Sequence, residues 1–185
     1  MKKSVFISRT VIHSVFAGIS IFLALAAKRY ADQFVGPIIP DLVLDHIPYV
    51  DTDFFFYQGA FMLVGVLLYV VVRAPRFIPF TLASIALMYL VRSVMMVTTH
   101  LPAASSVSGN DLFFSGHTAL PFLLGLIFWK YKTLRYFFFA ASCIAGASVL
   151  LSHVHYTIDV IAAPFITYAI FVLAKKLFKT EYEFL

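Results

Sequence analysis

The segment "FFFYQGAFMLVGVLLYVVVRAPR" (Phe54–Arg76) shows the pattern that decides the fold. Its apolar run, Phe54–Val72, is as long as a helix that crosses the hydrocarbon core of a bilayer, which takes roughly 17–25 residues. The run ends at the short basic group "RAPR" (Arg73–Arg76), and a second apolar run follows directly. The segment therefore predicts two transmembrane helices joined by a basic turn.

The composition of the whole chain supports a membrane protein. Hydrophobic residues make up 62% of the 185 residues and charged residues only 12%, whereas soluble domains are about 45–50% apolar. The mean hydropathy is +0.92. A soluble core of this size could not bury that much apolar surface. The single cysteine, Cys143, cannot form an intrachain disulfide.

The apolar runs predict an all-α fold, an integral membrane bundle of six transmembrane helices that forms a single domain over residues 1–185. The charged start "MKKSVFISRT" resembles a secretory signal, but no convincing small-residue cleavage site follows, so we expect a retained first span. The predicted spans are Val11–Ala27, Phe54–Val72, Phe77–Thr98, Leu112–Trp129, Leu134–Leu151 and Tyr156–Ala174.

The basic residues predict the orientation, because Lys and Arg near the ends of spans stay in the cytoplasm. All but three of the fourteen basic residues fall on one side if both termini are cytoplasmic; the exceptions are Lys28, Arg29 and Arg92. The net charge of +5 therefore reflects topology, and nucleic acid is not an expected partner. The residues on the cytoplasmic side are Lys2, Lys3, Arg9, Arg73, Arg76, Lys130, Lys132, Arg135, Lys175, Lys176 and Lys179.

Ionisable residues gather at the opposite, extracytoplasmic end of three predicted spans. Arg92 lies about two turns from the end of the third span, Asp111 and His117 flank the start of the fourth, and His155 and Asp159 lie at the start of the sixth. Ionisable groups inside a membrane are costly, so their presence raises a functional hypothesis. Their agreement in depth and side favours one shared site.

The stretch "SHVHYTIDV" (Ser152–Val160) brings a histidine and a carboxylate onto one helix face. His155 and Asp159 are four residues apart, so their side chains can meet. A carboxylate that holds one ring nitrogen leaves the other nitrogen directed at a substrate. This arrangement is typical of a nucleophile or a base.

The stretch "FFSGHTALP" (Phe113–Pro121) supplies the complementary groups. Ser115 is expected to cap a helix, Gly116 to allow close approach of the backbone, and His117 to project from the first turn. The starts of the fourth and sixth helices would converge and favour a phosphate, with Arg92 as an additional donor. Two histidines, a carboxylate and an anion site suit phosphoryl transfer, in which one His attacks phosphorus and the other protonates the leaving oxygen.

Other interpretations use the same residues. The His-x-x-x-Asp spacing with a distant His could ligate zinc, and His and Asp residues could relay protons in a proton-coupled carrier, although such residues should then lie near the midplane on broken helices. A non-catalytic scaffold would leave these residues without a role. Arg92 could simply snorkel or pair with Asp111, and a lone histidine such as His13 is often a packing residue.

Four stretches of the sequence share the features of one known family: "PIIPDLVLDHIP" (Pro37–Pro48), "RSVMMVTTHLP" (Arg92–Pro102), "SGHT" (Ser115–Thr118) and "HYTIDV" (His155–Val160). In this order they resemble the sphingomyelin synthase-related branch of the phosphatidic acid phosphatase type 2 superfamily, over about Pro37–Phe171. The chain has no Arg-Pro dipeptide, in contrast to the broader superfamily, and it has "GNDLFF" where Gly-Asp are often adjacent in the family.

The resemblance implies a six-helix, multi-pass membrane enzyme with an extracytoplasmic active site and no metal or other cofactor. By analogy, His155 forms a phosphohistidine, Asp159 orients His155, and His117 serves as acid and then base. Family members transfer a phospho-headgroup from a glycerophospholipid to ceramide or a similar lipid alcohol, and some relatives hydrolyse lipid phosphates. The expected partners are therefore membrane lipids, as donor and acceptor, with Arg92, Asp111, Ser115 and Gly116 as substrate-binding residues.

Overall fold

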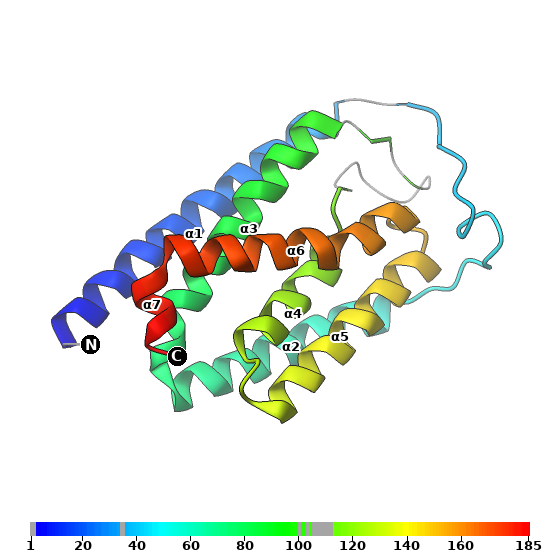
Figure 1. Ribbon diagram of the computed structural model, residues 1–185. Coiled ribbons are helices and arrows are strands. Elements are labelled where there is room, and N and C mark those ends of the chain that lie inside the picture. Colours follow the sequence, from blue (N-terminus) through cyan, green and yellow to red (C-terminus); the bar gives the residue numbers. More distant parts are fainter. Residues whose placement is uncertain (1–2, 34–35, 100, 103, 105–112) are drawn as a thin grey trace.

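The computed structural model of the chain describes residues 3–33, 36–99, 101–102, 104 and 113–185, and all regular structure in these ranges is helical (Figure 1). Six long or medium helices are joined by short turns and two longer connections. A 3₁₀ turn, η1 (Pro75–Phe77), precedes α3, and a short helix, α7, follows α6. The helices are α1 (Lys3–Ala31), α2 (Asp53–Arg73), α3 (Ile78–Thr99), α4 (Gly116–Ile127), α5 (Lys132–Leu151), α6 (Thr157–Leu177) and α7 (Lys179–Glu183).

The helices pack around α4. α1 lies along α3 at one side of the bundle, α5 packs on α2 and α4, and α6 packs on α3 and α4 (Figure 1). α7 folds back at the end of the bundle where α1 begins, so the two chain ends lie close together (Figure 1). That this end faces the cytoplasm follows only from the charge rule and stays a prediction.

Five helical segments are long and apolar enough to cross a membrane, which fits a multi-pass membrane protein. They correspond to all the predicted spans except the fourth. The helix α4 has 12 residues, or about 18 Å at 1.5 Å per residue, against a hydrocarbon core of about 30 Å. It begins at Gly116 and ends at Ile127, inside the predicted Leu112–Trp129, so a sixth span stays a prediction.

The helix α4 is short but it is also the best covered element. Ala119, Leu123 and Leu124 are fully buried, because α3, α5 and α6 surround α4. By contrast, Phe61 and Val72 on α2 are about three-quarters exposed, at 77% and 75%. Apolar side chains directed outward are expected where a helix faces lipid, whereas a helix enclosed by protein need not span the bilayer.

Candidate active site

The start of α4 is a buried turn in which the Ser115 side chain, the Ser115 N–H and the Phe114 carbonyl have hydrogen-bond partners. Ser115 is the N-cap residue, and its Oγ accepts hydrogen bonds from the Thr118 N–H (3.4 Å) and the Thr118 hydroxyl (3.3 Å). Phe114 and Ser115 are fully buried. Non-helical backbone at membrane depth is stable only if its N–H and C=O groups are satisfied. The neighbouring helices α3 and α6 supply those partners.

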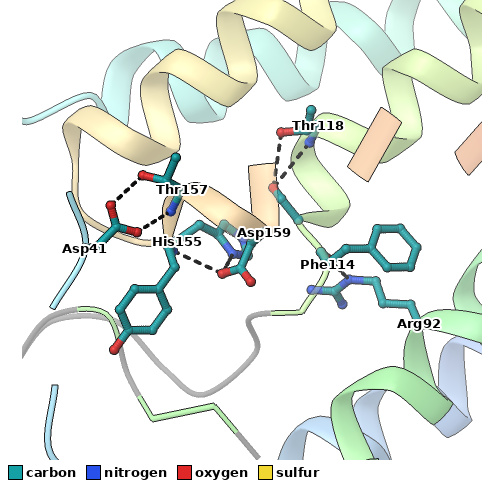
Figure 2. Close-up of polar contacts among 9 residues, drawn as sticks. Asp41, Arg92, Phe114, Thr118, His155, Thr157 and Asp159 are labelled. Carbon is teal, nitrogen blue, oxygen red and sulfur yellow. Dashed lines mark hydrogen bonds and ion pairs between the residues drawn. The ribbon is translucent and has the colours of Figure 1, made fainter. Parts of the chain in front are cut away.

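Arg92 of α3 is the first of these partners. Its Nε donates a hydrogen bond to the Phe114 carbonyl at 2.8 Å, and the side chain is only 5% exposed (Figure 2). A Cβ on Gly116 would lie 3.2 Å from this Nε, so the absence of a side chain at Gly116 lets the guanidinium reach the turn. Arg92 therefore enters the site instead of snorkelling toward an interface.

The second partner is α6. The Ser115 N–H donates to the Asp159 backbone carbonyl at 3.1 Å, so the first turn of α4 contacts the first turn of α6. The predicted convergence of these two helix starts is therefore present. The N-termini of helices carry free N–H groups and partial positive charge, which favour an anion.

On α6 the predicted histidine–carboxylate pair forms. His155 Nδ1 lies 3.3 Å from Asp159 Oδ2, and the same oxygen accepts the Tyr156 N–H at 3.0 Å (Figure 2). Both side chains are almost completely buried. Asp159 Oδ1 has no hydrogen-bond partner among the described residues. With Nδ1 next to the carboxylate, Nε2 of His155 is the ring nitrogen left to meet a substrate.

The turn between α5 and α6 explains how His155 is held. His153 adopts a positive φ of 51°, and the N–H groups of His153 and Val154 donate to the carbonyls of Leu150 (3.0 Å) and Val149 (2.9 Å). This is the hydrogen-bond pattern of a Schellman motif, which ends a helix with one left-handed residue. His153 thus closes α5, and the chain turns so that His155 points back into the bundle.

His117 comes from α4 to meet His155. The two ring centroids are 5.8 Å apart with an interplanar angle of 61°, so one phosphate group can reach both imidazoles. The structure thus brings together His117, His155 and Asp159, as the spacing of the sequence motifs predicted. Asp111 lies outside the described residues.

A cavity of about 290 Å³ opens beside His117 and Arg92. It lies between α2, α3, α4 and α5, and Gly59 and Ala145 are among its small apolar lining residues. An apolar cavity with a few polar groups at one end is typical of a ligand site. Here the polar end is the candidate active site, and the apolar part suits a hydrocarbon chain.

The loop before α2 also contacts the site. The sequence motifs gave no residue of this loop a role. Asp41 Oδ2 accepts the Thr157 N–H at 2.7 Å and Oδ1 accepts the Thr157 hydroxyl at 2.6 Å (Figure 2). The Tyr156 hydroxyl accepts the Ile39 N–H at 3.1 Å. Burial raises the pKa of Asp41, but the hydrogen bonds from Thr157, Leu44 and Val43 outweigh it and hold the pKa below the ordinary value of 3.8.

Asp41 therefore caps the first turn of α6, next to His155 and Asp159. The only signal in the sequence was its place in the Pro37–Pro48 stretch, because a contact between residues 116 positions apart leaves no periodic pattern. Phe114 was also missed, since it contributes its backbone carbonyl and not its side chain.

This geometry does not favour the two alternatives, a zinc site and a proton-coupled carrier. No group of three or more His, Cys, Asp or Glu side chains placed to hold a metal ion occurs in the part of the chain that the structure describes. The helix α6 is continuous from Thr157 to Leu177 although Pro164 lies inside it. The polar residues lie at helix starts, and not at a break in the middle of a span as a carrier would require.

Comparison with known proteins gives one match. Residues 108–176 match the family model described as PAP2 superfamily C-terminal, a segment that contains His117, His155 and Asp159 but neither Arg92 nor Asp41. No curated protein and no solved structure matches the chain. The family match carries no information on the sphingomyelin synthase-related branch. The matched segment is less than half of the chain, so the match makes residues 108–176 similar to the C-terminal part of that superfamily, and this similarity fits a lipid phosphatase or phosphotransferase.

Proposed function

We propose that the protein is a lipid phosphotransferase that acts at the extracytoplasmic face of its membrane. It moves a phospho-headgroup from a glycerophospholipid to ceramide or a related lipid alcohol through a phosphohistidine. The observation that carries this proposal is the buried His155–Asp159 pair within reach of His117, beside an apolar cavity.

In the first half-reaction, His155 Nε2 attacks the phosphorus of the donor lipid. The bond between phosphorus and the glycerol oxygen breaks, and protonated His117 donates its proton to that oxygen, so diacylglycerol leaves. Asp159 balances the charge that develops on the imidazole of His155. Its unpartnered Oδ1 leaves the carboxylate free to strengthen this contact as the charge appears.

In the second half-reaction, His117, now neutral, accepts the proton of the acceptor hydroxyl. The hydroxyl oxygen attacks phosphorus, the bond to His155 Nε2 breaks, and both histidines return to their starting states. Arg92 and the converging starts of α4 and α6 would stabilise the negative charge on the phosphoryl oxygens. Each proton and each bond is thus accounted for by groups at the site, with His117 acting twice.

The cavity supports a lipid substrate. At about 290 Å³ it is at the lower end of the roughly 300–1,000 Å³ of small-molecule sites, so it would hold only part of a lipid. We expect one chain to enter between α2 and α5 while the rest of the lipid stays in the bilayer.

A lipid phosphate phosphatase is the second candidate. It shares the first half-reaction, and water replaces the lipid alcohol in the second. The family match fits hydrolysis as well as transfer. What separates the two is whether water or a hydroxyl in the apolar cavity reaches the phosphohistidine first.

Product analysis in reconstituted membranes tests the proposal. Purified protein in nanodiscs would receive a headgroup-labelled phospholipid with ceramide, with diacylglycerol or with no acceptor. We expect a new labelled phospholipid only when the acceptor alcohol is present. A water-soluble labelled product in all three reactions would instead establish hydrolysis, and release of inorganic phosphate from a phosphorus-labelled lipid phosphate would establish the phosphatase.

The covalent step needs its own measurement. With phosphorus-labelled donor and no acceptor, we expect label on the protein that is lost in acid and is absent from His155→Gln. Tryptic mapping of the label to another residue, or equal labelling of His155→Gln, would refute His155 as the nucleophile.

A further inference from the structure

A second cavity lies at the other end of the bundle, far from the candidate active site. It has a volume of about 320 Å³ and lies between the end of α4, the α4–α5 turn, α6 and α7. The length of α4, about 18 Å at 1.5 Å per residue, separates Leu126 and Ile127 in this cavity from Gly116 and His117 in the first. The two cavities share no lining residue.

Two lysines line this second cavity without a carboxylate partner. Lys175 of α6 and Lys130 of the α4–α5 turn both border it, and neither forms an ion pair with any carboxylate in the described ranges. The acidic residues of α7 have other partners: Glu181 lies 3.0 Å from Arg9, and Glu183 lies 3.7 Å from Lys179. The charged side chains among the lining residues of this cavity are therefore both cationic.

Aromatic side chains fix one of these charges and shape the cavity. The Lys175 ammonium lies 5.0 Å from the ring centroid of Phe171 and 5.6 Å from that of Tyr182, both cation–π distances. Trp129 and Tyr168 line the same cavity and are more than half exposed. Half-exposed Trp and Tyr side chains are typical of the level of the lipid headgroups, where one edge of the ring is apolar and the other is hydrated.

We propose that this cavity binds the phosphate-bearing headgroup of an anionic phospholipid. The lipid would belong to the leaflet at the end of the bundle that carries Lys130 and Lys175, here called the basic end. Lys130 and Lys175 would contact the phosphate, while Leu126 and Ile127 form an apolar floor for the first part of an acyl chain. Basic pockets between transmembrane helices suit such headgroups. The site is separate from the proposed chemistry and does not depend on it.

A lipid titration with matched charge variants tests this site. Protein in a non-ionic detergent would be titrated with dihexanoyl phosphatidylglycerol, with dihexanoyl phosphatidylcholine, or with inorganic phosphate, and the unfolding temperature and bound mass measured by thermal shift and native mass spectrometry. We expect only phosphatidylglycerol to bind and to raise the unfolding temperature. Two lysines near a headgroup, at about 1 kcal/mol each, correspond to a roughly thirtyfold weaker affinity in Lys130→Gln/Lys175→Gln.

The control is Lys132→Gln/Lys176→Gln, which removes the same charge from two exposed lysines that do not line the cavity. We expect its affinity for phosphatidylglycerol to match the wild type. An equal loss in both double variants would reduce the effect to general surface attraction and overturn the proposal. Equal binding of phosphatidylcholine, or a full shift with inorganic phosphate alone, would also overturn it, because the ligand would then not be an anionic lipid.

Discussion

Each end of this bundle buries a histidine against a carboxylate, and the two pairs have different surroundings. His155 and Asp159 lie 3.3 Å apart at the start of α6, and His13 of α1 and Glu181 of α7 lie 2.9 Å apart at the other end. All four side chains are at most 5% exposed. The His13–Glu181 pair has the shorter distance, whereas the His155–Asp159 pair is slightly more buried.

The two histidine–carboxylate pairs differ in the residues that surround them. Glu181 also accepts a hydrogen bond from Arg9 at 3.0 Å, and the ring of Phe178 packs edge-on against His13 at 5.3 Å. That pair joins α1 to the C-terminal helix. At the start of α6, His155 has a second histidine beside it and a cavity next to that histidine. A buried histidine–carboxylate pair thus suggests proton chemistry only where a second acid–base group and space for a substrate accompany it.

The largest expected effect comes from removing one histidine at each end. We expect His155→Ala to lower turnover of the lipid donor by roughly a thousandfold or more, because it removes the proposed nucleophile. We expect His13→Ala to keep turnover within about threefold but to lower the free energy of unfolding by about 1–3 kcal/mol, since Glu181 loses a buried hydrogen bond. Both would be measured in the same nanodiscs, by product formation and by thermal unfolding.

The distinction between the two pairs would be wrong if His155→Ala kept its turnover, or if His13→Ala lost turnover and not stability. His155→Ala with normal turnover would make the His155–Asp159 pair structural. His13→Ala with normal stability and lost turnover would place chemistry at the basic end.

A smaller effect is expected from Asp41, which supports the His155–Asp159 pair through Thr157. Asp41→Asn replaces a charged acceptor at the start of α6 by a neutral one, and a charge-assisted hydrogen bond is roughly twice as strong as a neutral one. We expect kcat to fall by roughly tenfold with little change in KM, because Asp41 positions α6 and does not touch the proposed substrate. Asp51→Asn is the matched control, since Asp51 accepts a hydrogen bond only from the Asp53 N–H among the described contacts. A change confined to KM would contradict a positioning role.

The pH dependence of stability sharpens the comparison at the basic end. Burial raises the pKa of Glu181, but the hydrogen bond from His13 and the charge of Arg9 outweigh it, so the pKa lies below the ordinary 4.5. A lowered pKa means that ionised Glu181 stabilises the fold above about pH 4.5, and that this contribution is lost as the pH falls toward the folded-state pKa. The difference in unfolding temperature between wild type and Glu181→Gln should therefore be largest near neutral pH and shrink below pH 4.5. A difference that grows in acid would reverse the assignment.

The smallest effect is expected at His153, two residues before the proposed nucleophile. Its positive φ makes it a helix cap, so His153→Gly should leave turnover within about twofold and change stability by no more than about 1 kcal/mol. His153→Val should lower the unfolding temperature, because a β-branched residue is strained in the left-handed region. Loss of turnover in the stable His153→Gly protein would show that sequence proximity to His155 does reflect chemistry.

The sequence predicted the local parts of this comparison and missed the distant ones. The His155–Asp159 pair follows from a spacing of four residues on one helix, and the Ser115 cap from the residue type before an apolar run. The link between His13 and Glu181 spans 168 positions, and the sequence reading treated His13 as a lone histidine. The short length of α4 was also missed, because hydropathy does not record where a helix is enclosed by other helices.

What the amino-acid sequence determined by itself was membrane insertion, the positions of five long helices, and the groups at the start of α4 and α6. Each of these depends on interactions between residues close together in the chain. Only the tertiary structure decided that Arg92 holds the Phe114 carbonyl, that Asp41 caps α6, and that His155 lies beside His117, which lines a cavity. Those outcomes depend on which helices pack together, and packing joins residues whose separation in the chain carries no regular pattern.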